Sequence, residues 1–360
     1  MNKKIAVLSG DGIGPEIIQE AIKVLKAIEL KFNHQFEYKY ALIGAVAIDK
    51  TGNPYPDETH QICLENDAIL FGAIGDPKYD NDPTAKVRPE QGLLKMRSSL
   101  GLYANIRPVK SYDALLDASP LKNERIKGAD FIVVRELISG IYFGKPRGRS
   151  EDQTIAYDTC VYTKEEILRI TKTAFELAKN RKQKVTLLDK ANVLATSRLW
   201  RETVTEYAKQ FPEITLESNY IDSAAMEIIT KPTKFDVILT ENLFGDIISD
   251  EASVIAGSLG ILPSASIGDK NALYEPIHGS YPQAAGKNIA NPMATILSAA
   301  MLLENSFGML EESKAIVDAV EKAINNNFVT EDINDGKFST SQVGDKIVEF
   351  INLIWKFEML

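Results

Sequence analysis

Two aspartates four residues apart are the sharpest chemical signal in the sequence. Asp246 and Asp250 come shortly after the apolar run at 235–240 (FDVILT). On a helix this spacing puts both carboxylates on one face, where like charges repel by about 0.2–0.5 kcal/mol. A divalent cation between the two carboxylates replaces this repulsion with attraction, and hard oxygen ligands suit Mg²⁺ or Mn²⁺. Two solvated acids on a helix surface are the alternative, but ligand sites collect where strands of open α/β sheets end.

Three arginines form a second group of candidates. Arg97 and Arg107 flank residues 98–106, and Arg135 ends the apolar run 131–134 (FIVV). An arginine at the end of a core strand is costly to desolvate unless an anion pairs with it. Guanidinium groups bind carboxylates with two parallel hydrogen bonds, so three of them suit a small diacid. For each arginine alone, an internal salt bridge to a residue such as Glu136 is an equal alternative.

A lysine and a long loop complete the set. Lys190 follows Asp189, which itself comes after the apolar residues Leu187 and Leu188. Near other cations such a lysine could lose its proton close to neutral pH and act as a base, although a single lysine more often lies on the surface. The Gly- and Pro-containing loop 278–292 precedes an apolar helix, and its exposed backbone amides could hold a phosphate-bearing ligand.

Strands and helices alternate along the chain and determine where these residues lie. Strand-like apolar runs occupy 5–9, 68–72, 131–134, 184–188, 215–218 and 235–240. Helical periodicity occupies 17–28, 164–180, 293–304, 312–326 and 341–355. The alternation predicts an α/β architecture around a largely parallel sheet.

The turn at 10–16 (GDGIGPE) joins the first strand to the first helix, with Pro15 in the first helical turn. Its glycines lie at positions 10, 12 and 14, whereas the dinucleotide fingerprint G-x-G-x-x-G requires its third glycine where Pro15 stands. We therefore interpret the segment as a tight strand–helix turn rather than a Rossmann pyrophosphate loop.

Composition excludes several classes of protein. The 360 residues are 44% hydrophobic and 25% charged, as in an ordinary globular protein long enough for two compact regions. A net charge of −9 argues against a nucleic-acid partner. No apolar stretch approaches the roughly 18–20 residues that cross a membrane, and Cys63 and Cys160 have no metal-ligand spacing. Without a signal peptide at the start, we expect a cytoplasmic location.

Seven segments, in order, resemble the isocitrate/isopropylmalate dehydrogenase family of β-decarboxylating enzymes and cover nearly the whole chain. They are 10–16, 90–107, 134–137 with 140–144, 189–192 (DKAN), 220–222, 242–250 and 274–292. The resemblance implies two α/β regions sharing one large mixed sheet, which is not a Rossmann fold. Residues 1–100 and 255–360 would form the cofactor-side domain, and 101–254 an inserted substrate and dimerisation domain. It also implies a homodimer whose active sites are each completed by the partner subunit.

The same resemblance implies the ligands of a metal and of a diacid substrate. The metal, Mg²⁺ or Mn²⁺, is expected at Asp246 and Asp250 of one chain and Asp222 of the partner, and Asp222 also contacts the substrate. The substrate carboxylates are expected at Arg97, Arg107 and Arg135.

Catalytic and cofactor roles are implied in the same way. Lys190, donated across the interface, would take the proton of the substrate hydroxyl while hydride passes to NAD, and Tyr142 would protonate the enol carbon after CO₂ leaves. The cofactor-binding residues would be Glu90 and the loop residues His278, Gly279, Ser280, Tyr281, Pro282, Gln283, Ala284, Ala285, Gly286, Lys287, Asn288, Ile289, Ala290 and Asn291.

The choice of substrate depends on Leu93 and Leu94, which resemble the isopropylmalate branch; the isocitrate branch carries a hydroxyl-bearing residue there. Burying an isopropyl group on leucines gains about 2–3 kcal/mol, whereas an unpaired carboxylate costs several. We expect NAD-dependent conversion of 3-isopropylmalate to 4-methyl-2-oxopentanoate and CO₂ in leucine biosynthesis. The alternatives are a sister enzyme for isocitrate, tartrate, D-malate or another 3-alkylmalate, and a non-catalytic regulatory subunit of the family.

One position departs from the family pattern. Members that use NAD usually carry an aspartate where this chain has Gln283, and that carboxylate hydrogen-bonds the adenosine ribose and repels a 2′-phosphate. Gln283 keeps a hydrogen-bonding amide but removes the repulsion. Ala284 follows, where the branch that uses NADP has basic and tyrosine side chains. We expect NAD, with weaker discrimination than usual.

Overall fold

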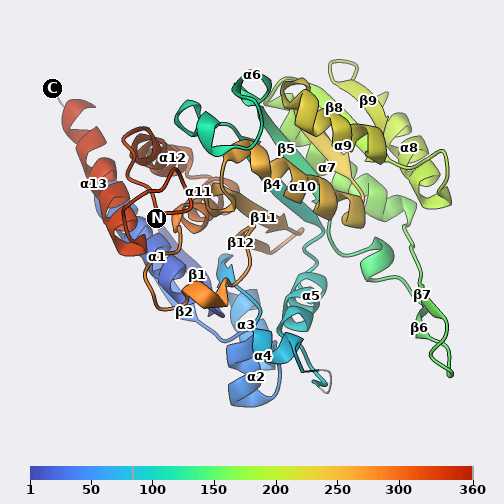
Figure 1. Ribbon diagram of the computed structural model, residues 1–360, viewed down its shortest axis with the longest axis horizontal. Coiled ribbons are helices and arrows are strands. Elements are labelled where there is room, and N and C mark those ends of the chain that lie inside the picture. The colour runs from blue at the N-terminus through green and yellow to red at the C-terminus, as the bar shows by residue number, and fades with distance from the viewer. Residues whose placement is uncertain (83–84, 359–360) are drawn as a thin grey trace. The chain divides into compact units, whose positions relative to one another are not determined.

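Strands and helices alternate in both parts of the computed structural model, which describes residues 1–82 and 85–358 (Figure 1). Unit 1 combines Met1–Leu102 with the chain from Gly257 onward, and unit 2 is Tyr103–Ala256. Both units are α/β, as the alternation predicts. In the described part of the chain, no helix is long and apolar enough to span a membrane.

Unit 1 arranges its strands in the order β2-β1-β3-β12-β11. Neighbouring strands are parallel except β11 and β12, which are antiparallel. The strands are β1 (Asn2–Gly10), β2 (Gln35–Tyr40), β3 (Ala68–Ala73), β11 (Pro263–Ile267) and β12 (Ala272–Pro276). The α-helices are α1 (Gly14–Phe32), α2 (Ala45–Thr51), α3 (Asp57–Glu65), α4 (Pro77–Asp80), α5 (Pro89–Ser99), α11 (Met293–Phe307), α12 (Leu310–Asn325) and α13 (Thr340–Glu358). The short 3₁₀ turns are η4 (Leu259–Ile261) and η5 (Pro282–Ala284).

Unit 2 has the strand order β4-β5-β10-β8-β9. Here β4 is antiparallel to β5, and the other neighbours are parallel. The strands are β4 (Ala104–Lys110), β5 (Asp130–Glu136), β8 (Lys184–Asp189), β9 (Thr215–Tyr220) and β10 (Val237–Thr240), with the separate ribbon β6 (Arg147–Arg149) and β7 (Ala156–Asp158). The α-helices are α6 (Asn123–Ile126), α7 (Lys164–Lys179), α8 (Ala195–Ala208), α9 (Ile221–Thr230) and α10 (Asn242–Ala256). The 3₁₀ turns are η1 (Asp113–Ala118), η2 (Gly140–Tyr142) and η3 (Pro232–Lys234).

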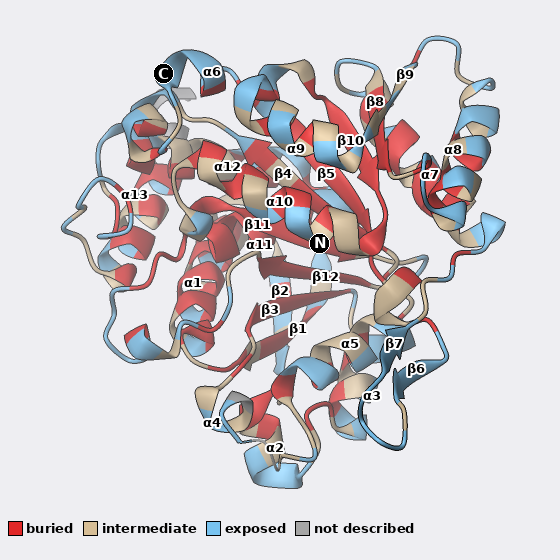
Figure 2. Cartoon of the chain, turned by 45° about the vertical axis from the view of Figure 1, so that its right-hand side comes forward, coloured by how far each residue is buried: buried red, intermediate tan, exposed pale blue. Residues whose placement is uncertain are grey.

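All six strands predicted from the sequence form, and the central ones among them, such as β3 and β10, are apolar because parallel strands covered on both faces must be so. All six residues of β3 are buried, as are all four of β10 (Figure 2). The predicted run 235–240 begins as a strand only at Val237, since Pro232 starts a 3₁₀ turn just before it. The strands that were not predicted are polar, like the largely exposed β2, or contain proline, like β11 and β12.

The turn at 10–16 is tight, as predicted. Gly10 and Gly12 have positive φ angles of 69° and 58°. A Cβ on Gly12 would lie 2.0 Å from the carbonyl oxygen of Ser280, and the amide of Ile13 donates to that oxygen at 2.8 Å. The turn therefore packs directly on the loop that follows β12.

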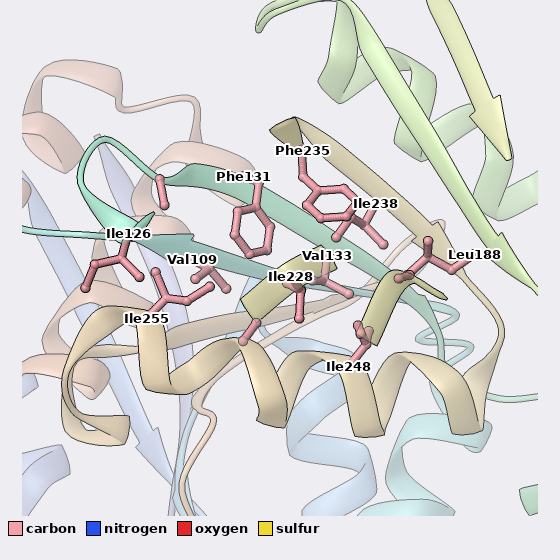
Figure 3. Packing of buried hydrophobic residues seen from close by; sticks show 13 residues of the cluster. Val109, Ile126, Phe131, Val133, Leu188, Ile228, Phe235, Ile238, Ile248 and Ile255 are labelled. Carbon is pink, nitrogen blue, oxygen red and sulfur yellow. The ribbon is translucent and has the colours of Figure 1, made fainter. Parts of the chain in front are cut away.

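One apolar cluster fixes helix α10 on the sheet of unit 2 (Figure 3). Phe131 of β5 and Phe235, just before β10, face each other with ring centroids 6.0 Å apart. Ile248 and Ile255 of α10 belong to the same cluster. Because α10 carries both aspartates singled out above, this packing sets where their carboxylates lie.

Replacing Phe235 with alanine tests this role. The ring is fully buried, so its removal should lower the free energy of unfolding by about 3–5 kcal/mol, measured by urea titration. Leu30→Ala is the control, because Leu30 is 87% exposed and its loss should change stability by less than about 0.5 kcal/mol. Equal effects of the two substitutions would mean that Phe235 does not hold the cluster together.

Candidate active site

The charged residues of unit 2 gather where β5 and β10 end. Arg135 is the penultimate residue of β5, and α10 begins two residues after β10. Because β4 is antiparallel to β5, it places Asn105 opposite Arg135 and brings Arg107 to the same edge. This is the edge at which open α/β sheets bind ligands.

Arg135 is only 3% exposed and is held by three hydrogen bonds to α10. Its Nη1 donates to Oδ1 of Asp246 at 2.5 Å, its Nη2 to Oδ1 of Asn242 at 2.9 Å, and its Nε to the backbone oxygen of Asn242 at 2.9 Å. Glu136, the internal partner considered from the sequence, instead accepts hydrogen bonds from the amides of Ile138 and Ser139. The buried guanidinium therefore pairs with an aspartate of the candidate metal site.

Arg107 contacts the same helix from β4 and is 7% exposed. It donates from Nη1 to Ser249 Oγ at 2.6 Å and to Asp250 Oδ1 at 3.3 Å, and its Nη2 lies 3.7 Å from Asp246 Oδ1. Its Nε donates to Asn105 Oδ1 at 2.6 Å. Two arginines and two aspartates thus form one cluster of balanced charge.

Asp246 and Asp250 lie one turn apart on α10, as their spacing predicts. The Asp250 side chain is 68% exposed and that of Asp246 34%, so both carboxylates remain within reach of a ligand. Partial burial raises the pKa of Asp250, the Asp246 carboxylate adds to the increase, and Arg107 and Arg135 oppose it. Two anionic oxygen donors of this kind fit a hard divalent cation. In the described ranges no three His, Cys, Asp or Glu side chains are grouped closely enough to hold a metal, so Asp222 of the same chain does not join them.

Tyr142 points its hydroxyl at this cluster from η2. The hydroxyl donates to Asp246 Oδ2 at 2.9 Å, and the Arg135 guanidinium lies 5.8 Å from the centre of the ring. Burial and this hydrogen bond raise the pKa of Tyr142 above its usual value. The phenol is therefore protonated at neutral pH, as a proton donor must be.

Lys190 and Asp222 form a separate pair in the same unit. The lysine follows β8, and its Nζ donates to Asp222 Oδ2 at 2.7 Å. This bond lowers the pKa of Asp222, whose side chain is 67% exposed. Asp189, directly before the lysine, is fully buried and takes two hydrogen bonds from Arg201. The end of β8 is thereby fixed, while the lysine is partly exposed and its partner Asp222 is largely exposed.

The remaining predicted substrate residues lie on α5 of unit 1. Arg97 donates from Nη2 to Glu275 Oε1 at 2.7 Å, and both side chains are largely buried. This is the internal salt bridge that the sequence left open as an alternative. Leu94 is half-buried, and Leu93 packs against an apolar cluster of unit 1. Glu90 lies in the first turn of the same helix.

The predicted cofactor loop borders a pocket of about 510 Å³ in unit 1. Six of the predicted residues line it, together with Ile13, the turn 258–260 and Asp332; the six are His278, Gly279, Tyr281, Ile289, Ala290 and Asn291. Gln283 is exposed and is not among the lining residues. Asn288 hydrogen-bonds Ser341 through both ends of its amide, which ties the loop to the start of α13.

His278 supplies an unused acceptor at this pocket. Its Nδ1 donates to the carbonyl of Gly279 at 2.9 Å, which leaves Nε2 without a proton when the ring is neutral. Burial lowers the pKa of His278, so the neutral form prevails. Within the described residues Nε2 is buried and has no hydrogen-bond partner. An orphaned acceptor of this kind fits a ligand that carries an amino group.

Several residues that shape these sites were not singled out from the sequence. Asn105, Ser249 and Asn242 each bind an arginine, and all three fall inside or beside the segments that carry the resemblance. Asn242 had one local signal, since it opens the helix that follows the buried strand β10. Asp332 reaches the pocket from a distant segment and accepts a hydrogen bond from Asn291 at 3.1 Å, which no local pattern indicates.

Comparison with known proteins gives one consistent result. Residues 4–347 match the model of the family described as isocitrate/isopropylmalate dehydrogenase. The 3-isopropylmalate dehydrogenase of Aquifex aeolicus is 56% identical, covering 96% of each chain, and that of Bacteroides fragilis is 54% identical, covering 98% of this chain and 99% of the relative. The crystal structure of isocitrate dehydrogenase from Methylococcus capsulatus superposes with a TM-score of 0.86 at 34% identity, covering 97% of this chain and 99% of that one.

Asp250→Asn tests whether the aspartate pair binds a cation. A neutral amide is a poorer ligand than a carboxylate, so the affinity for Mn²⁺, measured by calorimetry on the purified protein, should fall by roughly tenfold. In the unsubstituted protein, affinity should decline on acidification from a pH above the usual aspartate value of 3.8, because Asp250 must lose its proton to bind and its pKa is raised.

Glu251→Gln is the matched control, since it removes the same charge from the neighbouring residue of α10. It should leave the Mn²⁺ affinity within about twofold. If both substitutions weaken Mn²⁺ equally, only the overall charge of the helix matters and Asp250 is not a ligand.

Proposed function

Because the chain belongs to the isocitrate/isopropylmalate dehydrogenase family, we propose that it oxidises and decarboxylates 3-isopropylmalate with NAD, giving 4-methyl-2-oxopentanoate, CO₂ and NADH in leucine biosynthesis. One observation carries this proposal: a chain more than half identical to enzymes named for that reaction holds Arg107, Arg135, Tyr142, Asp246 and Asp250 in contact at one sheet edge. The sequence also carries the whole proposed catalytic and metal-binding set, which argues against a non-catalytic regulatory subunit; these residues are Tyr142, Lys190, Asp222, Asp246 and Asp250.

The substrate carboxylates bind to Arg107 and Arg135, with Arg97 as the third proposed contact. Both unit 2 guanidinium groups are more than nine-tenths buried, so they make strong, direct ion pairs with a ligand anion. Their present partners, Asp246 and Asp250, would then be neutralised by Mg²⁺ or Mn²⁺. When bound, the cation supplies a Lewis acid that makes the substrate hydroxyl easier to deprotonate. Leu93 and Leu94 are proposed to receive the isopropyl group.

Lys190 and Tyr142 then move protons in opposite directions. Lys190 takes the hydroxyl proton as the hydrogen on C2 leaves as hydride to NAD, which produces a ketone next to the carboxylate-bearing carbon. The bond from C3 to its carboxylate breaks, CO₂ departs, and the electron pair of that bond forms the C2–C3 double bond of an enolate. Tyr142 donates its phenolic proton to C3, and the enolate becomes the keto acid. Each proton transfer of this type contributes about 10²–10⁴-fold to the rate.

A second copy of the chain is proposed to complete each site. Lys190 and Asp222 pair with each other in one subunit, and Asp222 does not group with Asp246 and Asp250 among the residues described. Helices α9 and α10 also expose large apolar side chains, with Met226 64% and Ile247 57% exposed. We propose that these helices form the homodimer interface and that Lys190 and Asp222 act in the partner's site.

The cofactor is proposed to bind at the pocket of unit 1, with its adenosine half against the loop after β12. The pocket size, its apolar wall and the unused His278 Nε2 support this assignment, because an adenine amino group can donate to that nitrogen. Lining residues such as Ile13 and Ile289 would pack against the base. Ser280, Pro282, Ala284, Ala285, Gly286 and Lys287 remain proposed contacts of the same loop, and Glu90 of α5.

The direct test of function compares turnover of 3-isopropylmalate, isocitrate and D-malate in one assay that follows NADH. We predict the highest kcat/KM for 3-isopropylmalate, by at least tenfold, since a lost apolar contact costs about 10- to 200-fold. A preference for isocitrate or D-malate would reassign the enzyme within its family. NADH formation from none of these acids, despite binding them, would favour the regulatory subunit.

Lys190→Ala and Tyr142→Phe should damage different half-reactions. The lysine variant should lose oxidation of 3-isopropylmalate, because no base remains for the hydroxyl proton. The tyrosine variant should retain rapid formation of the first NADH and then slow down at protonation. Stopped-flow measurement of NADH separates the two phases. Wild-type kinetics in both variants would show that neither residue has its proposed role.

Gln283→Asp tests cofactor recognition at the position that departs from the family. If residue 283 faces the adenosine ribose, a carboxylate there should tighten NAD binding by up to roughly tenfold, because charge-assisted hydrogen bonds are stronger than neutral ones. Use of NADP should fall further through repulsion of the 2′-phosphate. The measurement is kcat/KM for both cofactors at one ionic strength. An unchanged NAD-to-NADP ratio would place residue 283 away from the ribose, and a wild-type preference for NADP would refute the cofactor assignment.

A further inference from the structure

Asn242, the first residue of α10, is fully buried between the substrate arginine and the loop of the proton donor. All four of its polar groups have partners on other elements. Its two oxygens accept from Arg135, its side-chain amide donates to the backbone oxygen of Ser139 at 3.0 Å, and its backbone amide donates to the Tyr162 hydroxyl at 2.9 Å. No other residue type offers this set of donors and acceptors at the same length.

The contacts with Arg135 fix both the position and the rotation of its guanidinium. Nε and Nη2 are both bound by Asn242, which directs Nη1 toward Asp246. The stem of Arg135 also packs on the first turn of α10, since a Cβ added to Gly245 would lie 2.5 Å from Cγ of Arg135. The plane in which the arginine meets a carboxylate is therefore set by the start of this helix.

The contact with Ser139 reaches the proton donor. Ser139 directly precedes η2, whose last residue is Tyr142. The Tyr162 hydroxyl accepts a hydrogen bond from the backbone amide of Asn242. The same hydroxyl packs closely on the η2 turn, because a Cβ on Gly140 would lie 2.1 Å from it. Two contacts from Asn242, one direct and one through Tyr162, thus hold the turn that aims Tyr142 at Asp246.

We propose that Asn242 is a positioning residue that sets the substrate-binding arginine and the proton-donating tyrosine at once, and so aligns binding with protonation. This inference rests on the roles of Arg135 and Tyr142 in the proposed function. Its two halves can be separated chemically, because the side-chain oxygen serves Arg135 and the side-chain nitrogen serves Ser139. If Asn242 merely filled the core, its substitutions would not change substrate affinity and the protonation step independently.

Asn242→Asp separates the halves. The variant keeps an acceptor for Arg135 but places a carboxylate oxygen against the Ser139 carbonyl, which repels it. The affinity for 3-isopropylmalate, measured by calorimetry, should stay within about threefold of wild type. Stopped-flow traces should show a rapid first turnover of NADH followed by a steady rate lower by roughly tenfold or more, because protonation has become slow.

Asn242→Ala removes both contacts and should weaken substrate affinity by roughly 10- to 100-fold as well as slowing the second phase. Asn105→Ala is the matched control, since the side chain of Asn105 accepts a hydrogen bond from the other proposed substrate arginine, Arg107. It should weaken affinity without producing a burst. Melting temperatures of all three variants, recorded in parallel, check that each is folded.

The results divide cleanly. Asn242→Asp with wild-type kinetics in both phases, or with lost affinity and no burst, would overturn the proposal. If Asn242→Ala does not fold, the aspartate variant still decides. If the wild type prefers a different acid of the same class, the comparison is made with that acid, so an error in the assigned substrate is distinguished from an error about Asn242. If no acid turns over, the proposed function fails. Separately, an Asn242→Ala variant that binds the substrate with wild-type affinity would show that Asn242 does not position Arg135.

Discussion

A guanidinium buried at the end of a strand must be paired, and Arg135 imposes that requirement on everything around it. Removing such a charge from water costs several kcal/mol unless an anion and further hydrogen bonds replace the lost solvent. Asp246 supplies the anion, and Asn242 accepts two further hydrogen bonds. Gly245 leaves room for the stem of the arginine on α10, so the first turn of that helix is shaped by one side chain from β5.

Under the proposed function, the same requirement lets the cluster exchange partners. In the structure, the positive charges of Arg107 and Arg135 and the negative charges of Asp246 and Asp250 balance one another. A dianionic substrate and a divalent cation would preserve that balance, because the guanidinium groups would pair with the carboxylates and the aspartates with the metal. Partial burial and the Asp246 carboxylate raise the pKa of Asp250, while Arg107 and Arg135 oppose the increase. Under the proposed function, each ligand would stabilise the charge arrangement that the other one needs.

The sequence predicts the scaffold well, because apolar runs and helical spacing are local signals. Strands such as β3, β5 and β10 were predicted because both of their faces are buried, and the spacing of Asp246 and Asp250 placed them on one face of a helix. Local patterns could not give the partners of Arg135. Asn242 lies 107 positions away along the chain and meets the arginine only because β5 and β10 are neighbours. The pairing of Arg97 with Glu275 spans 178 positions and was one of two open possibilities.

The proposed exchange of charge partners predicts thermodynamic linkage between the cation and the substrate, which can be measured. The dissociation constant of 3-isopropylmalate would be determined by calorimetry, without NAD, at several concentrations of Mn²⁺. If the cation frees the arginines by taking over the aspartates, saturating Mn²⁺ should tighten substrate binding by about 5- to 150-fold, and saturating substrate should tighten Mn²⁺ binding by the same factor. A substrate affinity that does not change with Mn²⁺ would show that the aspartates and the arginines do not exchange partners.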